Sequence, residues 1–361
     1  MKTNETKISR RQALTLAGAS AASICLPGAV FGQTTKQITI LQGSGSVLLA
    51  WAPSFIAEDI GLYKEEGITV ERVLNGSGPA GLSALLGSSA AILLNPPGEP
   101  LGALARGQKL KVLMAQSNFQ ASQLIISKDY AAKYGVTEDM PLDRKLAITK
   151  NFKGIRCGVT SPGSLSDHAA RAMIKGMGLD PATDAQILPL GSVPNAMAAM
   201  SRGALDAFSG AAPAGELAQA QQGAVILFRN SKDEIPGYKA LSGHVINARA
   251  VDVEQNADMF ATLVRADTKG LRYIVDNPKA AGELLYKSRY ASMAKEVWAQ
   301  VWEMNRSQFR TPYVTKESIE AWINLGVTPS PIDKKTVDIG RMIDMRFVDQ
   351  AVQKIGWKVQ A

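Results

Sequence analysis

Residues 75–97 read NGSGPAGLSALLGSSAAILLNPP, and residues 190–213 read LGSVPNAMAAMSRGALDAFSGAAP. Both stretches open on a Gly-Ser pair, continue into a helical run of small and apolar residues, and reach an apolar strand that ends at Pro. The two Gly-Ser pairs lie 115 residues apart. Any two strand–loop–helix–strand units share some of these features, so chance similarity is one explanation. We interpret the repetition as two lobes of similar topology.

The chain around these stretches alternates between short apolar runs and helical segments, which predicts an α/β fold with a central, mainly parallel sheet. We expect strands at residues 38–41, 68–74, 90–94 and 154–160. Residues 253–361 are expected to be mostly helical, because their apolar residues recur at helical spacing. Ligands of open α/β sheets bind at the carboxyl ends of the strands. The Gly-Ser loops of both lobes are therefore expected to face one site.

The composition is that of a globular protein. The chain has 361 residues, of which 46% are hydrophobic and 20% charged, and its mean hydropathy is −0.02. This excludes wholesale disorder and a multi-span membrane protein, and the length suggests roughly two domains. Two cysteines and two histidines exclude a disulfide scaffold and disfavour a metal site built from these residues. We therefore expect no metal and no cofactor.

The N-terminus predicts an export signal over residues 1–32. Basic residues are followed by a short, weakly apolar run and a Pro27-Gly28 break, which is the order found in secretory signals. The segment Ser9-Arg10-Arg11-Gln12-Ala13-Leu14 resembles the twin-arginine export motif, which implies the twin-arginine translocase as a partner. A general secretory signal that happens to contain Arg10 and Arg11 is the alternative. We expect cleavage near Gly32 and a periplasmic location.

Removal of residues 1–32 takes four basic residues and one acidic residue, so the net charge falls from +8 to +5. The remaining chain has no dense Lys or Arg run, so we expect no nucleic-acid partner. It also keeps a single cysteine, Cys157.

Four segments, taken in order, resemble the periplasmic solute-binding proteins of the nitrate, sulfonate, taurine and thiamine-precursor type, often called NMT1/THI5-like. They are Ile60-Gly-Leu-Tyr-Lys-Glu-Glu-Gly-Ile-Thr-Val70, the Gly76-Ser77 helix start, Phe152-Lys-Gly-Ile-Arg-Cys-Gly-Val-Thr-Ser-Pro-Gly-Ser164 and Met200-Ser-Arg-Gly-Ala-Leu-Asp-Ala207. The resemblance runs from about residue 36 to 275.

This resemblance implies a two-lobed periplasmic-binding-protein fold of type II, with a ligand cleft between the lobes and a helical C-terminal extension. Lobe I would comprise residues 36–124 and 242–361, and lobe II residues 125–241, with crossings near 124–127 and 241–245. The C-terminal helices would pack on lobe I and reach across the hinge. The implied function is capture of a small organic molecule by lobe closure and its delivery to an ABC permease in the inner membrane. The carrier is expected to be a monomer.

Loops that precede helices are the candidate binding elements, because a helix start presents free N–H groups and a partial positive charge. The predicted pocket rim consists of Ser44, Gly45, Ser46, Gly76, Ser77, Gly163, Ser164 and Ser192. Other strand ends add Asn95, Ser117, Asn118 and Gly210 as polar contacts. Trp51 is the best candidate for stacking on a ligand, although it could instead fill the core.

Each candidate has a structural alternative. A serine before a helix is also an ordinary N-cap. Asp167, in the first turn of the lobe II helix, already complements that helix dipole and counts against a strong anion site there. His244 lies on a predicted crossing strand, where we expect a structural role rather than a ligand contact.

Two other functions remain open: an exported enzyme, or a ligand sensor, on the same bilobal fold. The chain has no Walker-type, GxSxG or HExxH sequence, so we predict a binding protein rather than an enzyme. The ligand is expected to be a sulfonate, a carboxylate or a pyrimidine.

Overall fold

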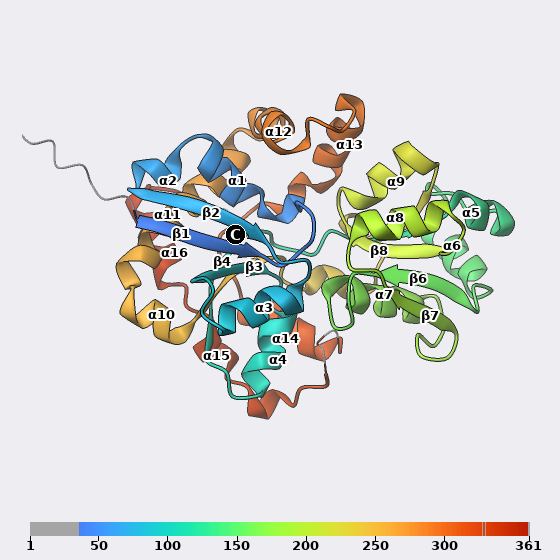
Figure 1. Cartoon of the computed structure of the whole chain (residues 1–361), viewed down its shortest axis with the longest axis horizontal. Coiled ribbons are helices and arrows are strands. Elements are labelled where there is room, and N and C mark those ends of the chain that lie inside the picture. The colour runs from blue at the N-terminus through green and yellow to red at the C-terminus, as the bar shows by residue number, and fades with distance from the viewer. Residues whose placement is uncertain (1–35, 327, 329, 360–361) are drawn as a thin grey trace, which may run out of the picture. The chain divides into compact units, whose positions relative to one another are not determined.

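The structure is a computed structural model that describes residues 36–326, 328 and 330–359. The predicted signal at residues 1–32, with Arg10 and Arg11, lies outside the described residues. Within them the chain forms two five-stranded sheets (Figure 1). We call the elements built around the first sheet lobe I and those built around the second sheet lobe II.

The first sheet has the strand order β2-β1-β3-β10-β4. Strand β1 pairs in parallel with β2 and β3, whereas β10 pairs antiparallel with β3 and β4. The strands are β1 (Lys36–Gln42), β2 (Ile68–Leu74), β3 (Ile92–Asn95), β4 (Leu110–Ala115) and β10 (Val245–Arg249).

The second sheet has the order β7-β6-β8-β5-β9 and the same pattern of directions. Its strands are β5 (Ser122–Ile126), β6 (Ile155–Val159), β7 (Ala185–Pro189), β8 (Ala207–Ala211) and β9 (Val225–Arg229). The two sheets correspond strand by strand: β7 matches β2, β6 matches β1, β8 matches β3, β5 matches β10, and β9 matches β4. The prediction of two lobes with similar topology is confirmed.

Strands β5 and β10 are the antiparallel members, and each begins just after the chain has passed from one sheet to the other. Residues 116–121 join β4 of lobe I to β5 of lobe II, and the chain returns to lobe I before Val245. The exact lobe boundaries, at 124/125 and 241/242, stay predictions.

Helices cover both faces of each sheet, which explains why the strands are apolar on both sides. Ile38 and Ile40 of β1 face the core shared with α1 and α11, whereas Leu41 faces the core under α3. In lobe II, Leu124 and Ile126 face the core under α7, and Ile125 faces α8 and α9. The helices of these layers are α1 (Ala52–Asp59), α3 (Gly78–Leu86), α4 (Gly98–Ala105), α7 (Leu165–Gly176), α8 (Val193–Ser201), α9 (Ala214–Gln222) and α11 (Ala257–Asp276).

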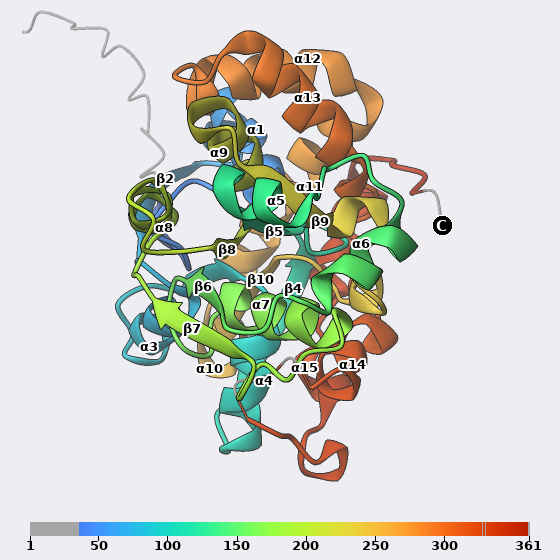
Figure 2. The ribbon, with the colours of Figure 1, turned by 90° about the vertical axis from the view of Figure 1, so that its right-hand side faces the viewer.

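The C-terminal part is mostly helical, as predicted, and it touches both lobes. Helix α16 packs on α11 of lobe I, and α13 contacts α9 of lobe II (Figure 2). On α14, the indole of Trp322 donates to Ser242 Oγ at 3.1 Å, next to the returning crossing. The remaining helices are α2 (Leu62–Glu65), α5 (Lys128–Tyr134), α6 (Leu142–Thr149), α10 (Ala250–Gln255), α12 (Pro278–Leu285), α13 (Lys295–Asn305), α14 (Lys316–Asn324), α15 (Ile339–Met342) and α16 (Arg346–Lys354).

Among the described residues, none of the helices has the length and apolar character needed to cross a membrane.

Candidate functional site

A cavity of about 50 Å³ lies between the two lobes, where strands of both sheets end. Lobe I contributes the loop after β1, the start of α3, the start of α4 and the residue before β10. Lobe II contributes the loop after β6, the starts of β5, α7 and α8, and the end of β8. The lining residues are Gly43, Ser44, Leu48, Gly76, Ser77, Gly78, Pro96, Glu99, Ser122, Thr160, Ser164, Leu165, Ser166, Val193, Gly210, Ala211 and His244.

Of the residues predicted from the sequence, five line this cavity: Ser44, Gly76, Ser77, Ser164 and Gly210. Eight do not: Gly45, Ser46, Trp51, Asn95, Ser117, Asn118, Gly163 and Ser192. The five come from both lobes: Ser44, Gly76 and Ser77 from lobe I, and Ser164 and Gly210 from lobe II. Ser192 of the second Gly-Ser pair does not line the cavity, although Val193, the next residue, does.

The repeated Gly-Ser loops have nearly identical geometry. Ser77 and Ser192 are the N-caps of α3 and α8, with φ angles of −153° and −152°. Each is preceded by a glycine in the left-handed region, Gly76 at +72° and Gly191 at +80°, where a side chain would be strained. The Ser77 hydroxyl accepts the N–H of Ala80 at 3.4 Å, so this serine is both an N-cap and part of the cavity wall.

Trp51 is not on the cavity wall, and its predicted stacking role is not supported by its position. The side chain is fully buried in the lobe I core beside Phe55. Its indole N–H donates to Nδ1 of His244 at 3.0 Å. The helix that begins at Ala52 turns its first residues into the core, and the adjacent tryptophan follows them. The core-filling alternative describes Trp51 correctly.

Three of the predicted polar contacts are used inside the protein. The Asn95 side-chain oxygen accepts from Asn247 Nδ2 at 2.6 Å, and Ser117 Oγ accepts the N–H of His244 at 2.9 Å. The side-chain oxygen of Asn118 accepts the N–H groups of Arg310 and Thr311. Buried polar atoms need hydrogen-bond partners, and these three side chains find theirs within the protein, at β10, at the residue before it and in the C-terminal segment.

His244 was expected to be structural only, and this expectation was incomplete, because the residue also lines the cavity. Burial lowers the pKa of His244 to about 3, so the ring is neutral. Since Nδ1 accepts the indole N–H of Trp51, the proton of the neutral ring must sit on Nε2. Nε2 has no hydrogen-bond partner among the described residues. His244 therefore offers one free donor.

Glu99 is the residue that the sequence reasoning missed entirely. It lies in the first turn of α4, is 3% exposed and lines the cavity. No other residue in the described part of the chain donates a hydrogen bond to either carboxylate oxygen. Desolvation by burial raises the pKa of Glu99 to about 8. A sequence signal existed, since Glu99 is the one charged residue between Arg72 and Arg106 and follows a strand end.

The loop of lobe II satisfies its own N–H groups. Asp167 accepts the N–H of Gly163 at 2.9 Å and pairs with Arg171 at 2.8 Å. The N–H of Thr160 donates to the Ser166 hydroxyl at 2.9 Å. The N–H group of Gly163 is therefore bonded within its own loop and does not line the cavity. This geometry agrees with the expectation that Asp167 weakens any anion site at the start of α7.

The lobes approach each other closely at the rim of the cavity. A methyl group placed on Gly45 of lobe I would lie 3.5 Å from Cβ of Ser192 in lobe II. The cavity of about 50 Å³ is far below the roughly 300–1,000 Å³ typical of small-molecule pockets. Entry of a solute of more than a few atoms therefore requires the lobes to part.

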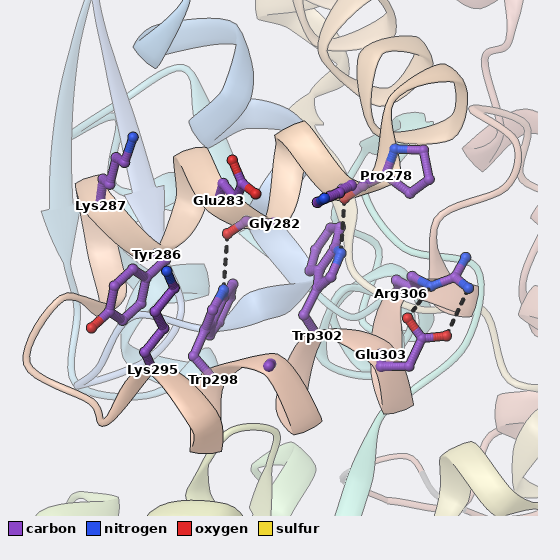
Figure 3. Close-up of a pocket in the computed structure, with 12 residues that line it drawn as sticks. Pro278, Gly282, Glu283, Tyr286, Lys287, Lys295, Trp298, Trp302, Glu303 and Arg306 are labelled. Carbon is purple, nitrogen blue, oxygen red and sulfur yellow. Dashed lines mark hydrogen bonds and ion pairs between the residues drawn. The ribbon is translucent and has the colours of Figure 1, made fainter.

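A larger cavity, of about 680 Å³, lies between α12 and α13 of the C-terminal region (Figure 3). Its floor is formed by Trp298 and Trp302, whose indole N–H groups donate to the backbone oxygens of Gly282 and Pro278, each at 2.9 Å. The indoles therefore present only apolar surface to the groove. The predicted binding residues do not line this groove, and its walls come from the C-terminal helices alone.

The described residues contain no group of three or more His, Cys, Asp or Glu side chains that could hold a metal ion. Cys157 is fully buried on β6, and desolvation raises its pKa to about 12. A thiol held in its protonated form is a poor nucleophile.

Solved structures show the same fold at low sequence identity. A protein from Bordetella bronchiseptica RB50 has a TM-score of 0.73 and 19% identity, over 90% of this chain and 99% of that chain. The periplasmic nitrate-binding protein NrtA from Synechocystis PCC 6803 has a TM-score of 0.66 and 15% identity, over 89% of each chain. The aliphatic sulphonate binding protein SsuA from Escherichia coli has a TM-score of 0.60 and 17% identity, over 86% of this chain and 92% of that chain. The desulfurization enzyme DSZB has the fold too, at a TM-score of 0.58, so the fold by itself does not exclude catalysis.

The curated proteins contain no significant match to this sequence. The model of the NMT1-like family matches residues 46–281, which is more than half of the chain. That range holds both repeated Gly-Ser loops, Glu99 and His244. The two-lobed periplasmic-binding-protein fold predicted from the sequence is confirmed, and the chain belongs to the NMT1-like family.

Proposed function

We propose that this protein is the extracytoplasmic solute-binding component of an ABC importer, which captures a small organic molecule by closing its lobes and presents it to a membrane permease. The observation that carries the proposal is the cavity between like-built loops of the two lobes. The family membership and the names of the structural neighbours NrtA and SsuA support it.

Lobe closure is the proposed mechanism. The open form exposes both sets of loops, and a solute that contacts both of them favours the closed form by its differential contacts. The two crossings between the sheets are the proposed hinges. The ATPase that drives release would belong to the transporter. The carrier is proposed to act as a monomer.

A thermal-shift screen tests the binding function. Protein refolded from urea, and so free of bound solute, should be heated with sulfonates, carboxylates, nitrate and pyrimidines, the classes expected from the sequence and the fold. A true ligand at 100 times its Kd stabilises the folded state by about 2.7 kcal/mol. For a chain of this size we expect a rise in Tm of about 3–4 °C. If no class raises Tm and the protein instead turns over a substrate, the binding proposal fails and the enzyme reading stands.

Export through the twin-arginine translocase, with removal of about 32 residues, remains part of the proposal. Changing both Arg10 and Arg11 to Lys should leave the precursor in the cytoplasm, while the unchanged chain is recovered from the periplasm. N-terminal sequencing of the periplasmic form checks the cleavage position. Export of the double-lysine precursor at the normal level would favour a general secretory signal.

A further inference from the structure

The wall of the inter-lobe cavity carries a carboxyl group with no partner. Both oxygens of Glu99 are buried and no other described residue donates to them, whereas the carboxylate of Asp167 in the same region is bonded to Gly163 and Arg171. Within the part of the chain that the structure describes, no Lys or Arg lines the cavity. A buried carboxyl group with two vacant oxygens costs stability unless something pairs with it.

The start of α3 shows how closely the structure holds this group. A Cβ atom placed on Gly78, the first residue of α3, would collide with Oε1 of Glu99. Glycine at this position therefore lets the carboxyl group lie against the helix start. The positive end of α3, which the sequence offers as a candidate binding element, already has a carboxyl group of the protein beside it.

The lobe II helix start is complemented in the same way by Asp167, in the first turn of α7. Once Glu99 is ionised, near pH 8 and above, an anionic solute at the start of α3 would meet a like charge in a desolvated site, where the repulsion is strong. The geometry favours a solute that donates hydrogen bonds over one that accepts them at these positions.

His244 supplies the complementary group. Its Nε2–H is a buried donor without a partner on the wall of the same cavity. The cavity therefore presents a vacant two-oxygen acceptor, Glu99, and a vacant donor, His244. A paired set of N–H donors on a planar group fits two carboxylate oxygens at once.

We propose that the solute captured in this cavity is a small nitrogen base whose two parallel N–H groups, as in an amidinium or guanidinium, pair with both oxygens of Glu99, while an acceptor elsewhere on the solute receives the Nε2–H of His244. This rests on the proposed binding function and narrows its ligand class. It also distinguishes this chain from neighbours whose names record nitrate or sulfonate as ligand.

Matched pairs of probes test the charge preference directly. Acetamidine and benzamidine have nearly the shapes of acetate and benzoate but the opposite charge. Calorimetric titration of the refolded, solute-free protein at pH 8 should give amidine affinities at least tenfold above those of the matching carboxylates. Tighter binding of acetate, benzoate or methanesulfonate would overturn the proposal.

The pH dependence gives a second, independent readout. Among the described residues, Tyr238 interacts electrostatically with Glu99, and His244 lines the same cavity. Both stay neutral, because burial raises the pKa of Tyr238 and lowers that of His244. Glu99 holds its proton up to a pH of about 8, so an amidinium must displace that proton when it binds. Affinity for benzamidine should therefore fall about tenfold per pH unit below pH 8. An anion that accepts a bond from protonated Glu99 would instead bind with constant affinity below pH 8 and lose affinity above it.

Glu99→Gln keeps the shape of the side chain and removes its charge. We expect it to weaken benzamidine binding at least tenfold at pH 8 and to abolish the pH slope. Glu283→Gln removes the same charge from an exposed residue of α12 that lines the C-terminal groove and not the inter-lobe cavity, and it should change neither. Unchanged amidine affinity in the Glu99 variant would overturn the proposal. If amidines fail while another class raises Tm in the screen, the ligand assignment falls and the binding function stands.

Discussion

Glu99→Gln raises the stability of the solute-free protein, and the gain grows with pH. The pKa of Glu99 is about 8 in the folded protein and 4.5 in its ordinary state, with desolvation as the main cause. Between these values the unfolded chain has lost the proton and the folded chain keeps it, so wild-type stability falls as pH rises. From pH 5 to pH 8 this single group should cost about 3 kcal/mol, and Gln at this position does not titrate.

Urea unfolding of both proteins at pH 5 and pH 8 measures the effect. Each other titratable group contributes equally to the two proteins, so the difference between them isolates Glu99. We expect a variant that is about 3 kcal/mol more stable relative to wild type at pH 8 than at pH 5. A difference that does not change with pH would mean that Glu99 is ionised and paired in solution.

Arg229→Met is expected to destabilise the protein by about 3–5 kcal/mol, because it leaves a buried carboxylate without its cation. Arg229, at the end of β9, is 3% exposed and pairs with Glu216, which is 4% exposed. It also donates to Glu138 Oε1 at 2.6 Å. Methionine fills most of the space but supplies no donor.

Arg306→Met is the matched control, since Arg306 pairs with Glu303 on the surface, where their side chains are 42% and 70% exposed. Exposed ion pairs contribute about 0–1 kcal/mol, so this change should have little effect in the same urea experiment. Adding Glu216→Gln to Arg229→Met should recover part of the loss. A cost below about 1 kcal/mol for Arg229→Met would show that water reaches Glu216.

Glu216 and Glu99 are both buried carboxyl groups, but they differ in whether a cation is paired with them. In lobe II, Glu216 is neutralised by Arg229 and also accepts from Gln123 Nε2 at 2.9 Å. In the cavity, Glu99 has no such partner among the residues described. The two predicted stability changes have opposite signs, because Arg229→Met leaves a buried carboxylate without its partner, whereas Glu99→Gln removes a carboxyl group that has none. Proteins keep such unfavourable groups mainly where they act on a ligand.

The sequence predicts the strands and the repeat well, because these depend on local periodicity and on small turn residues. The strand expected at 68–74 is β2 to the residue, and the Gly-Ser pairs are the starts of α3 and α8. The directions in which the side chains of Trp51, Asn95 and Ser117 point could not be predicted from local patterns. Each contacts residues more than 100 positions away in the chain, namely His244 and Asn247.

What the sequence by itself determined is the two-lobed plan and the loops that face the gap. Strand alternation and Gly-Ser helix starts are local patterns, and the fold joins them in the same way twice. Only the tertiary structure decided the chemistry of the gap. Whether a buried group is free or paired depends on what lies across from it, and for Glu99 and His244 those neighbours come from segments far apart in the chain. The charge preference that we propose for the cavity therefore rests on the packing of the two lobes and not on any single motif.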